Sequence, residues 1–260
     1  MALLQRLLRG LGRGAVVTAH HAGGIGILLW RIAVATLRGR VALRDVVDQA
    51  VEMGVGSLPL VLVTSVLSGV VTSQQGGYQF TGSIPLYVLG SVVASSVVLE
   101  LGPVMTAFVL IGRVGARITA ELGTMQVSEQ IDALLSLGRD PVRVLAAPRL
   151  LAGILVTPLL VGIANCVGLF AGMVAARLDV GLGYESFLYG ARLFWHNWDM
   201  FYSLLKATAF GVIIPIISTH MGLRTRGGAE GVGRATTASV VFMIISVLVL
   251  DALFPPLFLN

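Results

Sequence analysis

Residues 86–111 read LYVLGSVVASSVVLELGPVMTAFVLI, and this stretch decides the fold class. It exceeds the roughly 20 apolar residues that a helix needs to cross the hydrocarbon core of a bilayer. Its single charged residue, Glu100, lies near the middle. A stretch of this length with one charge predicts a transmembrane helix rather than a segment of a soluble domain.

Other apolar stretches of similar length lie on both sides of this one in the sequence. The chain is 56% hydrophobic and 12% charged, whereas a soluble domain carries about 25% charged residues. We therefore predict an all-α membrane protein with about five transmembrane helices. The predicted spans are residues 54–73, 86–111, 150–176, 202–221 and 236–259.

The distribution of charge predicts the orientation of the chain in the membrane. Three segments hold 15 of the 18 basic residues: the region before the first span and the connections after the second and fourth spans. The positive-inside rule therefore places the N-terminus in the cytoplasm and, after five crossings, the C-terminus in the periplasm of a bacterial inner membrane. The remaining basic residues, Arg177, Arg192 and Lys206, are predicted to lie on or near the outer face. We interpret the net charge of +5 as topology and predict no nucleic-acid partner.

Residues 1–45 are expected to form an amphipathic segment that lies in the cytoplasmic interface, ahead of a permease domain at 46–260. Apolar residues recur there at helical spacing beside arginines, which is typical of interfacial helices. Cleavage as a signal peptide is the alternative, but the charged region is too long and Arg31 interrupts the apolar stretch. The leucines concerned are Leu3, Leu4, Leu7, Leu8 and Leu11.

Glu100 is the sharpest candidate for a functional residue. A carboxyl at such depth costs several kcal/mol unless it faces a bundle interior or a wet cavity. Ser96 precedes it by one helical turn. The pair either contacts substrate in a cavity or forms an interhelical contact that only fixes the packing.

The first span carries two stripes of small and hydroxyl-bearing residues. Such stripes either hold helices together or line a cavity for a lipid headgroup. The third span carries a ladder of small residues whose partner helix, in this chain or in a second copy, the sequence leaves open. The stripes are Thr64, Ser68 and Thr72, and Ser65, Gly69 and Ser73, followed by Gln75 and Tyr78; the ladder is Ala164, Gly168, Gly172 and Ala176.

The predicted cytoplasmic loop 112–149 contains a short amphipathic helix. Ser128 is expected to cap it, and Glu129 and Asp132 then fall in the first turn, where negative charge is favourable. Gly138 is expected to end it. The helix has an apolar face of Ile131, Leu134 and Leu135, which either rests on the bilayer or inserts into a groove of a cytoplasmic partner.

An ordered set of motifs in this chain resembles the Mla-type (MlaE/YrbE) permease family of ABC transporters. The resemblance covers the chain from about the first span to its end. It is carried by Glu100-Leu101-Gly102-Pro103, Gly112-Arg113, Ala120-Glu121-Leu122-Gly123-Thr124-Met125, Glu129-Gln130-Ile131-Asp132-Ala133-Leu134, Pro148-Arg149 and Gly231-Val232-Gly233-Arg234-Ala235-Thr236-Thr237.

The resemblance implies a homodimer that moves phospholipid or a related lipid between inner and outer membranes. Cytoplasmic ATPase subunits would bind ATP and Mg²⁺ and dock on the loop helix, and a periplasmic MCE-domain protein would complete the system. It implies substrate contacts at Glu100, Tyr78, Gln75, Ser96 and Leu99. Some members of the family carry an arginine at the position of Leu99. Partner contacts are implied at Glu121, Met125, Glu129, Gln130, Asp132 and Leu134.

Several functions are disfavoured by what the sequence contains. No G-x-x-x-x-G-K-[ST] motif occurs, so ATP hydrolysis is expected in a partner. Cys166 is the single cysteine, which excludes an intrachain disulfide and a multi-cysteine metal site; no metal site or cofactor is predicted in this chain.

Two alternatives to an ABC permease remain. They are a membrane-embedded lipid-modifying enzyme, which needs convergent acids or histidines, and a proton-coupled secondary transporter using Glu100. The latter typically shows paired intramembrane charges or inverted repeats, and the sequence suggests neither.

Overall fold

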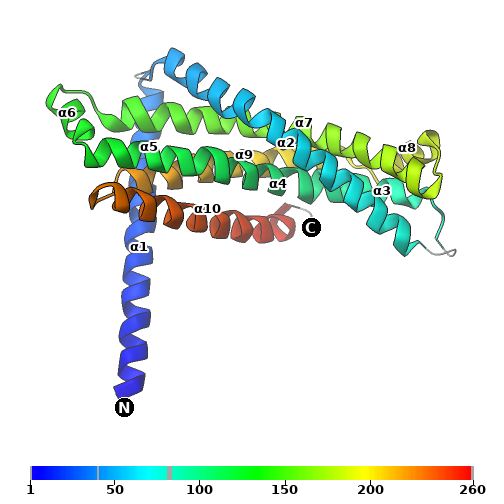
Figure 1. Ribbon diagram of the computed structural model, residues 1–260, viewed down its shortest axis with the longest axis horizontal. Helices are drawn as coiled ribbons and strands as arrows, with labels where there is room; N and C mark the ends of the chain where they lie inside the picture. The colour runs from blue at the N-terminus through cyan, green and yellow to red at the C-terminus, as the bar shows by residue number, and fades with distance from the viewer. Residues whose placement is uncertain (1, 40, 81–83, 259–260) are drawn as a thin grey trace.

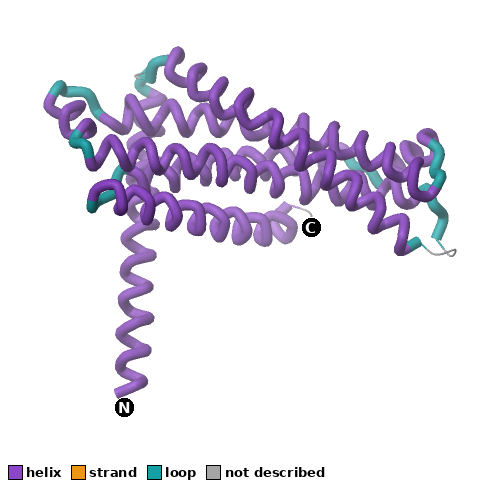
Figure 2. The backbone as a smooth tube through the Cα atoms, in the orientation of Figure 1, coloured by secondary structure: helices purple, strands orange, loops and turns teal. Residues whose placement is uncertain are grey.

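The computed structural model describes residues 2–39, 41–80 and 84–258, and these contain helices and connecting loops but no strands (Figure 1). Long helices run side by side along one direction, and α1 leaves them at a steep angle (Figure 2). Three π-helical segments, η1 to η3, continue directly into α-helices. In chain order the elements are α1 Ala2–Leu37, α2 Leu43–Gln79, α3 Val88–Ser95, η1 Ser96–Leu101, α4 Gly102–Leu110, η2 Ile111–Gly115, α5 Ala116–Val127, α6 Gln130–Ser136, η3 Val142–Ala146, α7 Ala147–Val180, α8 Tyr184–Leu193, α9 Asn197–Gly222 and α10 Gly228–Phe258.

The five predicted spans are confirmed, because the described residues contain five helical segments long and apolar enough to cross a membrane. Each segment is longer than the predicted span, although the second begins at Val88 rather than at residue 86. The segment from Val88 to Val127 has 40 residues and is therefore about 60 Å long, which is about twice the thickness of the hydrocarbon core. The helices thus continue past the apolar layer into the polar regions. The five segments are Leu43–Gln79, Val88–Val127, Val142–Val180, Asn197–Gly222 and Gly228–Phe258.

The small-residue ladder on α7 packs against α2 of the same chain. Ser65 and Gly69 of α2 lie directly against Gly168 and Gly172, and a Cβ added at Gly69 would overlap the carbonyl oxygen of Gly168. Backbones that approach this closely gain dispersion contacts that larger side chains would prevent. The question that the sequence left open is therefore answered for these residues: the ladder holds two helices of one chain together.

The C-terminal half of α1 packs on the bundle, whereas its N-terminal half projects away (Figure 1). Leu28 and Ile32 are buried in the main core, and Arg31 pairs with Asp140 at 3.0 Å. The side chains of the five predicted interfacial leucines, at residues 3–11, lie outside the described residues. The interfacial position of this segment stays a prediction.

The predicted loop 112–149 is mostly helix. Its first part continues the second span through η2 and α5, and its last part already belongs to η3 and α7. The expected cap at Ser128 is wrong: its hydroxyl donates to Thr124 O at 2.7 Å, within the end of α5. Glu129, with a left-handed φ of 61°, precedes α6 instead. Gly138 follows α6 with a φ of 70°, as expected of a glycine after a helix C-terminus.

Candidate functional site

A cavity of about 720 Å³ lies between α2 and the continuous helix formed by α3, η1 and α4. One part of its lining is apolar and the other carries hydroxyl, amide and carboxyl groups. An amphipathic lining of this kind suits an amphipathic ligand. The lining residues are Thr64, Leu67, Ser68, Val71, Thr72, Gln75, Gly76, Gln79, Val92, Ser96, Glu100, Leu101 and Met105.

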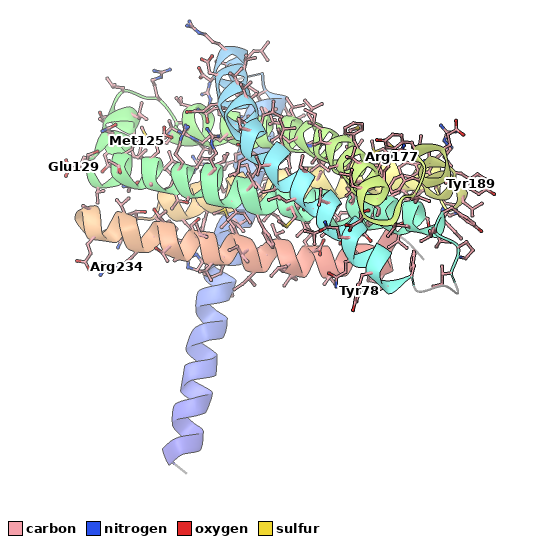
Figure 3. The ribbon with its side chains drawn as sticks, turned by 45° about the vertical axis from the view of Figure 1, so that its right-hand side comes forward. Tyr78, Met125, Glu129, Arg177, Tyr189 and Arg234 are labelled. Carbon is pink, nitrogen blue, oxygen red and sulfur yellow. The ribbon has the colours of Figure 1, made fainter. Side chains whose placement is uncertain are left out.

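Three of the five predicted substrate residues line this cavity: Glu100, Ser96 and Gln75. Leu99 is not among the lining residues, although it neighbours Glu100 in η1. Tyr78 also lies outside the lining, and its side chain is 87% exposed near the end of α2 (Figure 3). The structure therefore brings one turn of η1 and the end of the α2 stripe together and leaves Tyr78 apart from them.

The two stripes on α2 have separate roles. Thr64, Ser68 and Thr72 line the cavity, whereas Ser65, Gly69 and Ser73 are buried. One stripe therefore packs inside the bundle and the other faces a cavity, while a lipid headgroup in that cavity stays a prediction. The stripes lie one residue apart in sequence, and a step of one residue turns a helix by about 100°.

The threonine hydroxyls of the cavity donate their protons to their own helix. Thr64 Oγ1 donates to Leu60 O at 3.0 Å, and Thr72 Oγ1 donates to Ser68 O at 2.7 Å. A hydroxyl has one proton and two lone pairs. These two oxygens therefore present acceptors to the cavity.

A buried ion cluster joins three spans behind the cavity. Lys206 Nζ of α9 donates to Glu100 Oε2 of η1 at 2.6 Å and to Leu99 O at 3.2 Å. Asp251 Oδ1 of α10 lies 2.5 Å from the same ammonium. The two groups form an ion pair, but their geometry does not meet that of a hydrogen bond. The Lys206 side chain is fully buried, whereas the Glu100 side chain is 44% exposed.

Two sequence interpretations are corrected by this cluster. Lys206 was expected on or near the outer face, and paired intramembrane charges were not expected at all. A signal for the cluster was present in the sequence, since Glu100, Lys206 and Asp251 each fall inside a predicted span. Ionisable groups at such depth normally pair with one another. Three such groups on three spans therefore predict mutual contact.

Glu100 is held in place by irregular backbone as well as by its ion pair. It lies in η1, a π-helical segment of six residues, and such wide turns occur frequently at functional sites. Gly102 follows, where a Cβ would overlap Asn165 of α7. Asn165 in turn donates from Nδ2 to Ser203 Oγ of α9 at 2.9 Å. Contacts to two neighbouring helices therefore fix the turn that presents the carboxylate to the cavity.

The predicted partner-binding residues lie at one end of the bundle, where Figure 3 shows Met125 and Glu129; Tyr78 and Tyr189 lie at the other end. Ile131 is buried and anchors α6. Glu129, Gln130 and Asp132 are exposed, and Leu134 is half-buried. The side chains available to a partner therefore include Glu129, which precedes α6, and Asp132 in its first turn.

Glu121 has a different environment from the other predicted partner residues. Its Oε1 accepts a hydrogen bond from Arg149 Nη2 at 2.6 Å, and the Arg149 side chain is only 4% exposed. Arg117, which lies 3.8 Å from Glu121, also pairs with Glu52 of α2. The Glu121 carboxylate thus takes part in an intramolecular charge network that links α2, α5 and α7.

Comparison with known proteins decides the family. The sequence model described as "Permease MlaE" matches residues 46–256. The chain belongs to the MlaE permease family. A probable ABC transporter permease protein from Synechocystis sp. is 37% identical to this MlaE permease. The match covers 85% of the present chain and 84% of the relative.

Relatives of this MlaE permease extend to other bacteria and to a plant. A probable ABC transporter permease protein from Rickettsia prowazekii is 33% identical over 98% of this chain and 99% of the relative. "Protein TRIGALACTOSYLDIACYLGLYCEROL 1, chloroplastic" from Arabidopsis thaliana is 34% identical over 87% of this chain and 65% of the relative. The resemblance inferred from the motifs is therefore confirmed at the level of the family.

Proposed function

We propose that this MlaE permease moves phospholipid or a related lipid between the inner and outer membranes of a bacterium. The energy would come from ATP and Mg²⁺ bound by a separate ATPase subunit. The observation that carries the proposal is the cavity between α2 and α3–η1–α4, which combines apolar walls with a polar stripe and one carboxylate. Its volume of about 720 Å³ lies within the range of ligand-binding pockets. The Arabidopsis relative is named after a lipid, trigalactosyldiacylglycerol, and this name supports a lipid cargo.

The ATPase subunit is proposed to dock on α6 and the residues beside it. α6 is short, is anchored by the buried Ile131, and presents Glu129 and Asp132 to solvent. An amphipathic helix of this kind fits a groove on a partner. Movement of α6 would reach the spans through α5 and α7, and Glu121 and Arg149 join these two helices.

Two copies of the chain and a periplasmic MCE-domain protein complete the proposed assembly. The apolar windows of α2 and α10 are the least buried of the five candidate spans, at 22% and 17%. Helices with so little cover in one chain suit contact with lipid or with a second copy. The N-terminus is proposed to be cytoplasmic and the C-terminus periplasmic.

Charge reversal on α6 tests the ATPase partner. We expect the double variant Glu129→Lys, Asp132→Lys to lose the ATPase subunit that copurifies with the wild-type chain. The residue before α6 and the acid in its first turn then both change from negative to positive. The measurement is an affinity pull-down from mild detergent with identification of bound proteins by mass.

The matched control reverses two exposed acids at the other end of the bundle, Asp179→Lys and Glu185→Lys. It should retain the subunit at the wild-type level. An ATPase that stays bound to the α6 variant would exclude α6 as its docking site, and wild-type chain without any ATPase would exclude the ABC assignment.

Filling the cavity tests the lipid cargo. Ser68→Trp is expected to reduce ATP-dependent transfer of fluorescent phospholipid from proteoliposomes at least tenfold, because the indole occupies space that the ligand needs. Val63→Trp, on the exposed part of α2 and outside the cavity, should transfer lipid at close to the wild-type rate. Equal rates in both variants would contradict a substrate path through this cavity.

Proton-coupled transport is the second candidate, because the Lys206–Glu100–Asp251 cluster supplies the paired intramembrane charges that such transporters use. The two functions differ in their energy source. A proton-coupled transporter moves its cargo when a pH gradient is imposed without nucleotide. The proposed permease moves lipid only with ATP and its ATPase subunit.

A further inference from the structure

The cavity of this permease presents a negative charge and no positive one. Glu100 is the charged residue of its lining; of the described residues that line it, none is arginine, lysine or histidine. Whatever ligand enters meets a carboxylate whose side chain is 44% exposed. The charge of the headgroup therefore bears directly on its binding free energy.

Lys206 cannot offer a positive charge to a ligand in the cavity. Its ammonium has three N–H donors, and three oxygens already surround Nζ: Glu100 Oε2 at 2.6 Å, Asp251 Oδ1 at 2.5 Å and Leu99 O at 3.2 Å. Its side chain is 0% exposed. The cation is thus paired with two acids and covered by protein.

The ion cluster also carries an excess of negative charge. Glu100 and Asp251 share one ammonium, so with both carboxyls ionised one formal negative charge has no counterpart. An uncompensated charge at membrane depth is costly, and a ligand that brings a positive charge to Glu100 would remove that cost. An anionic headgroup would increase it.

Two threonines of the lining add hydrogen-bond acceptors to that of the carboxylate. Thr64 and Thr72 have donated their protons to backbone carbonyls, so their oxygens accept. Gln75 and Gln79, further along α2, carry amide N–H groups that suit the oxygens of a phosphodiester. This arrangement provides acceptors for an ammonium and neutral donors for a phosphate.

From these observations we propose that the cavity selects lipids whose headgroup carries a primary ammonium, as in phosphatidylethanolamine, over anionic lipids. Choline is a poorer fit, because a quaternary ammonium has no N–H to donate and is typically recognised by aromatic side chains. The described lining residues include no aromatic ring. The proposal rests on the proposed function of this same cavity, to which it adds the class of headgroup.

The test uses the full chain copurified with its ATPase subunit and reconstituted in bilayers. These contain equal amounts of phosphatidylethanolamine, phosphatidylcholine and phosphatidylglycerol with identical acyl chains. Lipids retained after extraction are quantified by native mass spectrometry, and ATP-dependent transfer is measured for each headgroup. We expect the ethanolamine lipid to be enriched about tenfold over the glycerol lipid, as a charge-assisted hydrogen bond gives, with choline between them.

Three variants separate the charge from the fold of the cavity. Glu100→Gln should reduce the enrichment to within about twofold, and Glu100→Asp should restore most of it. Ser68→Lys leaves the Glu100–Lys206 pair intact and adds a cation to the cavity wall, so it should shift the preference toward phosphatidylglycerol even if Glu100→Gln fails to fold.

The outcomes distinguish the two levels of the proposal. ATP-driven transfer that favours phosphatidylglycerol, or that shows no headgroup preference, would overturn the ammonium selectivity and leave the lipid-transport function standing. Absence of ATP-driven transfer for all three lipids would overturn the proposed function, and the selectivity with it.

Discussion

A Lys206→Met variant is expected to lose about 3–5 kcal/mol of unfolding free energy, because removing one partner of a buried ion pair leaves the others uncompensated. Here the loss leaves two carboxylates, Glu100 and Asp251, facing each other across the space of the former ammonium. Methionine approximates the volume of the lysine stem, so packing contributes little to the change. Unfolding in mild detergent titrated with sodium dodecyl sulfate measures the difference.

The matched control neutralises the whole cluster. The triple variant Lys206→Met, Glu100→Gln, Asp251→Asn should recover most of the lost stability, since replacing a complete buried ion cluster with neutral groups is often close to neutral. A triple variant as unstable as the single one would show that the cost of Lys206→Met comes from packing rather than from charge.

The second large effect is expected at the contact between α2 and α7. Gly69→Val should destabilise the fold by about 1–3 kcal/mol or more, the usual range for overpacking. Its Cβ would overlap the backbone of Gly168, which cannot move without displacing α7. Gly69→Ala should show a smaller effect in the same direction. The measurement is the same detergent titration.

Gly162→Val provides the control, because the position lies in α7 itself and a Cβ there meets no atom within 4 Å. The substitution changes helix propensity in the same way as at Gly69 but meets open space. It should leave stability within about 0.5 kcal/mol of wild type, as surface substitutions generally do. A comparable loss at both positions would attribute the effect to the glycine backbone rather than to the helix contact.

The spans were predictable from sequence because hydropathy depends on local composition alone. A run of about 20 apolar residues has few alternatives to crossing a membrane, and each predicted span overlaps a longer helical segment. The ends were less predictable. Residues 116–127 contain charges that hydropathy assigns to a loop, yet α5 continues there with Ile118 and Leu122 buried and with α9 and α10 packed against it.

The site could be predicted only in part, because the side chains that form it belong to different helices. Glu100 and Ser96 share one helix, so their common position in the cavity follows from spacing. The contact of Lys206 and Asp251 with Glu100 depends on how α9 and α10 rotate about their axes, which no spacing within a single helix determines. Tyr78 lies on α2 among residues that line the cavity but is itself exposed outside the lining, and its substrate contact remains a prediction.

The capping of α6 shows a further limit of local patterns. Ser128 followed by Gln130 and Ile131 has the composition of a helix start, but Ser128 is still within reach of Thr124 O and ends α5 instead. The left-handed backbone at Glu129 then separates the two helices. Sequence identified the presence of the helix, and the tertiary arrangement determined the residue at which it begins.

The chain positions of the three clustered charges have a consequence for biosynthesis. A chain made from its N-terminus brings Glu100 into the membrane first, Lys206 with the fourth span, and Asp251 with the last. The first two form a pair of opposite charge, so a nascent chain that has inserted four spans already shields both. The final span enters carrying an acid whose partner is in place. A ribosome-stalled intermediate that ends after α9 should therefore resist membrane-protein quality control better than one that ends before Lys206.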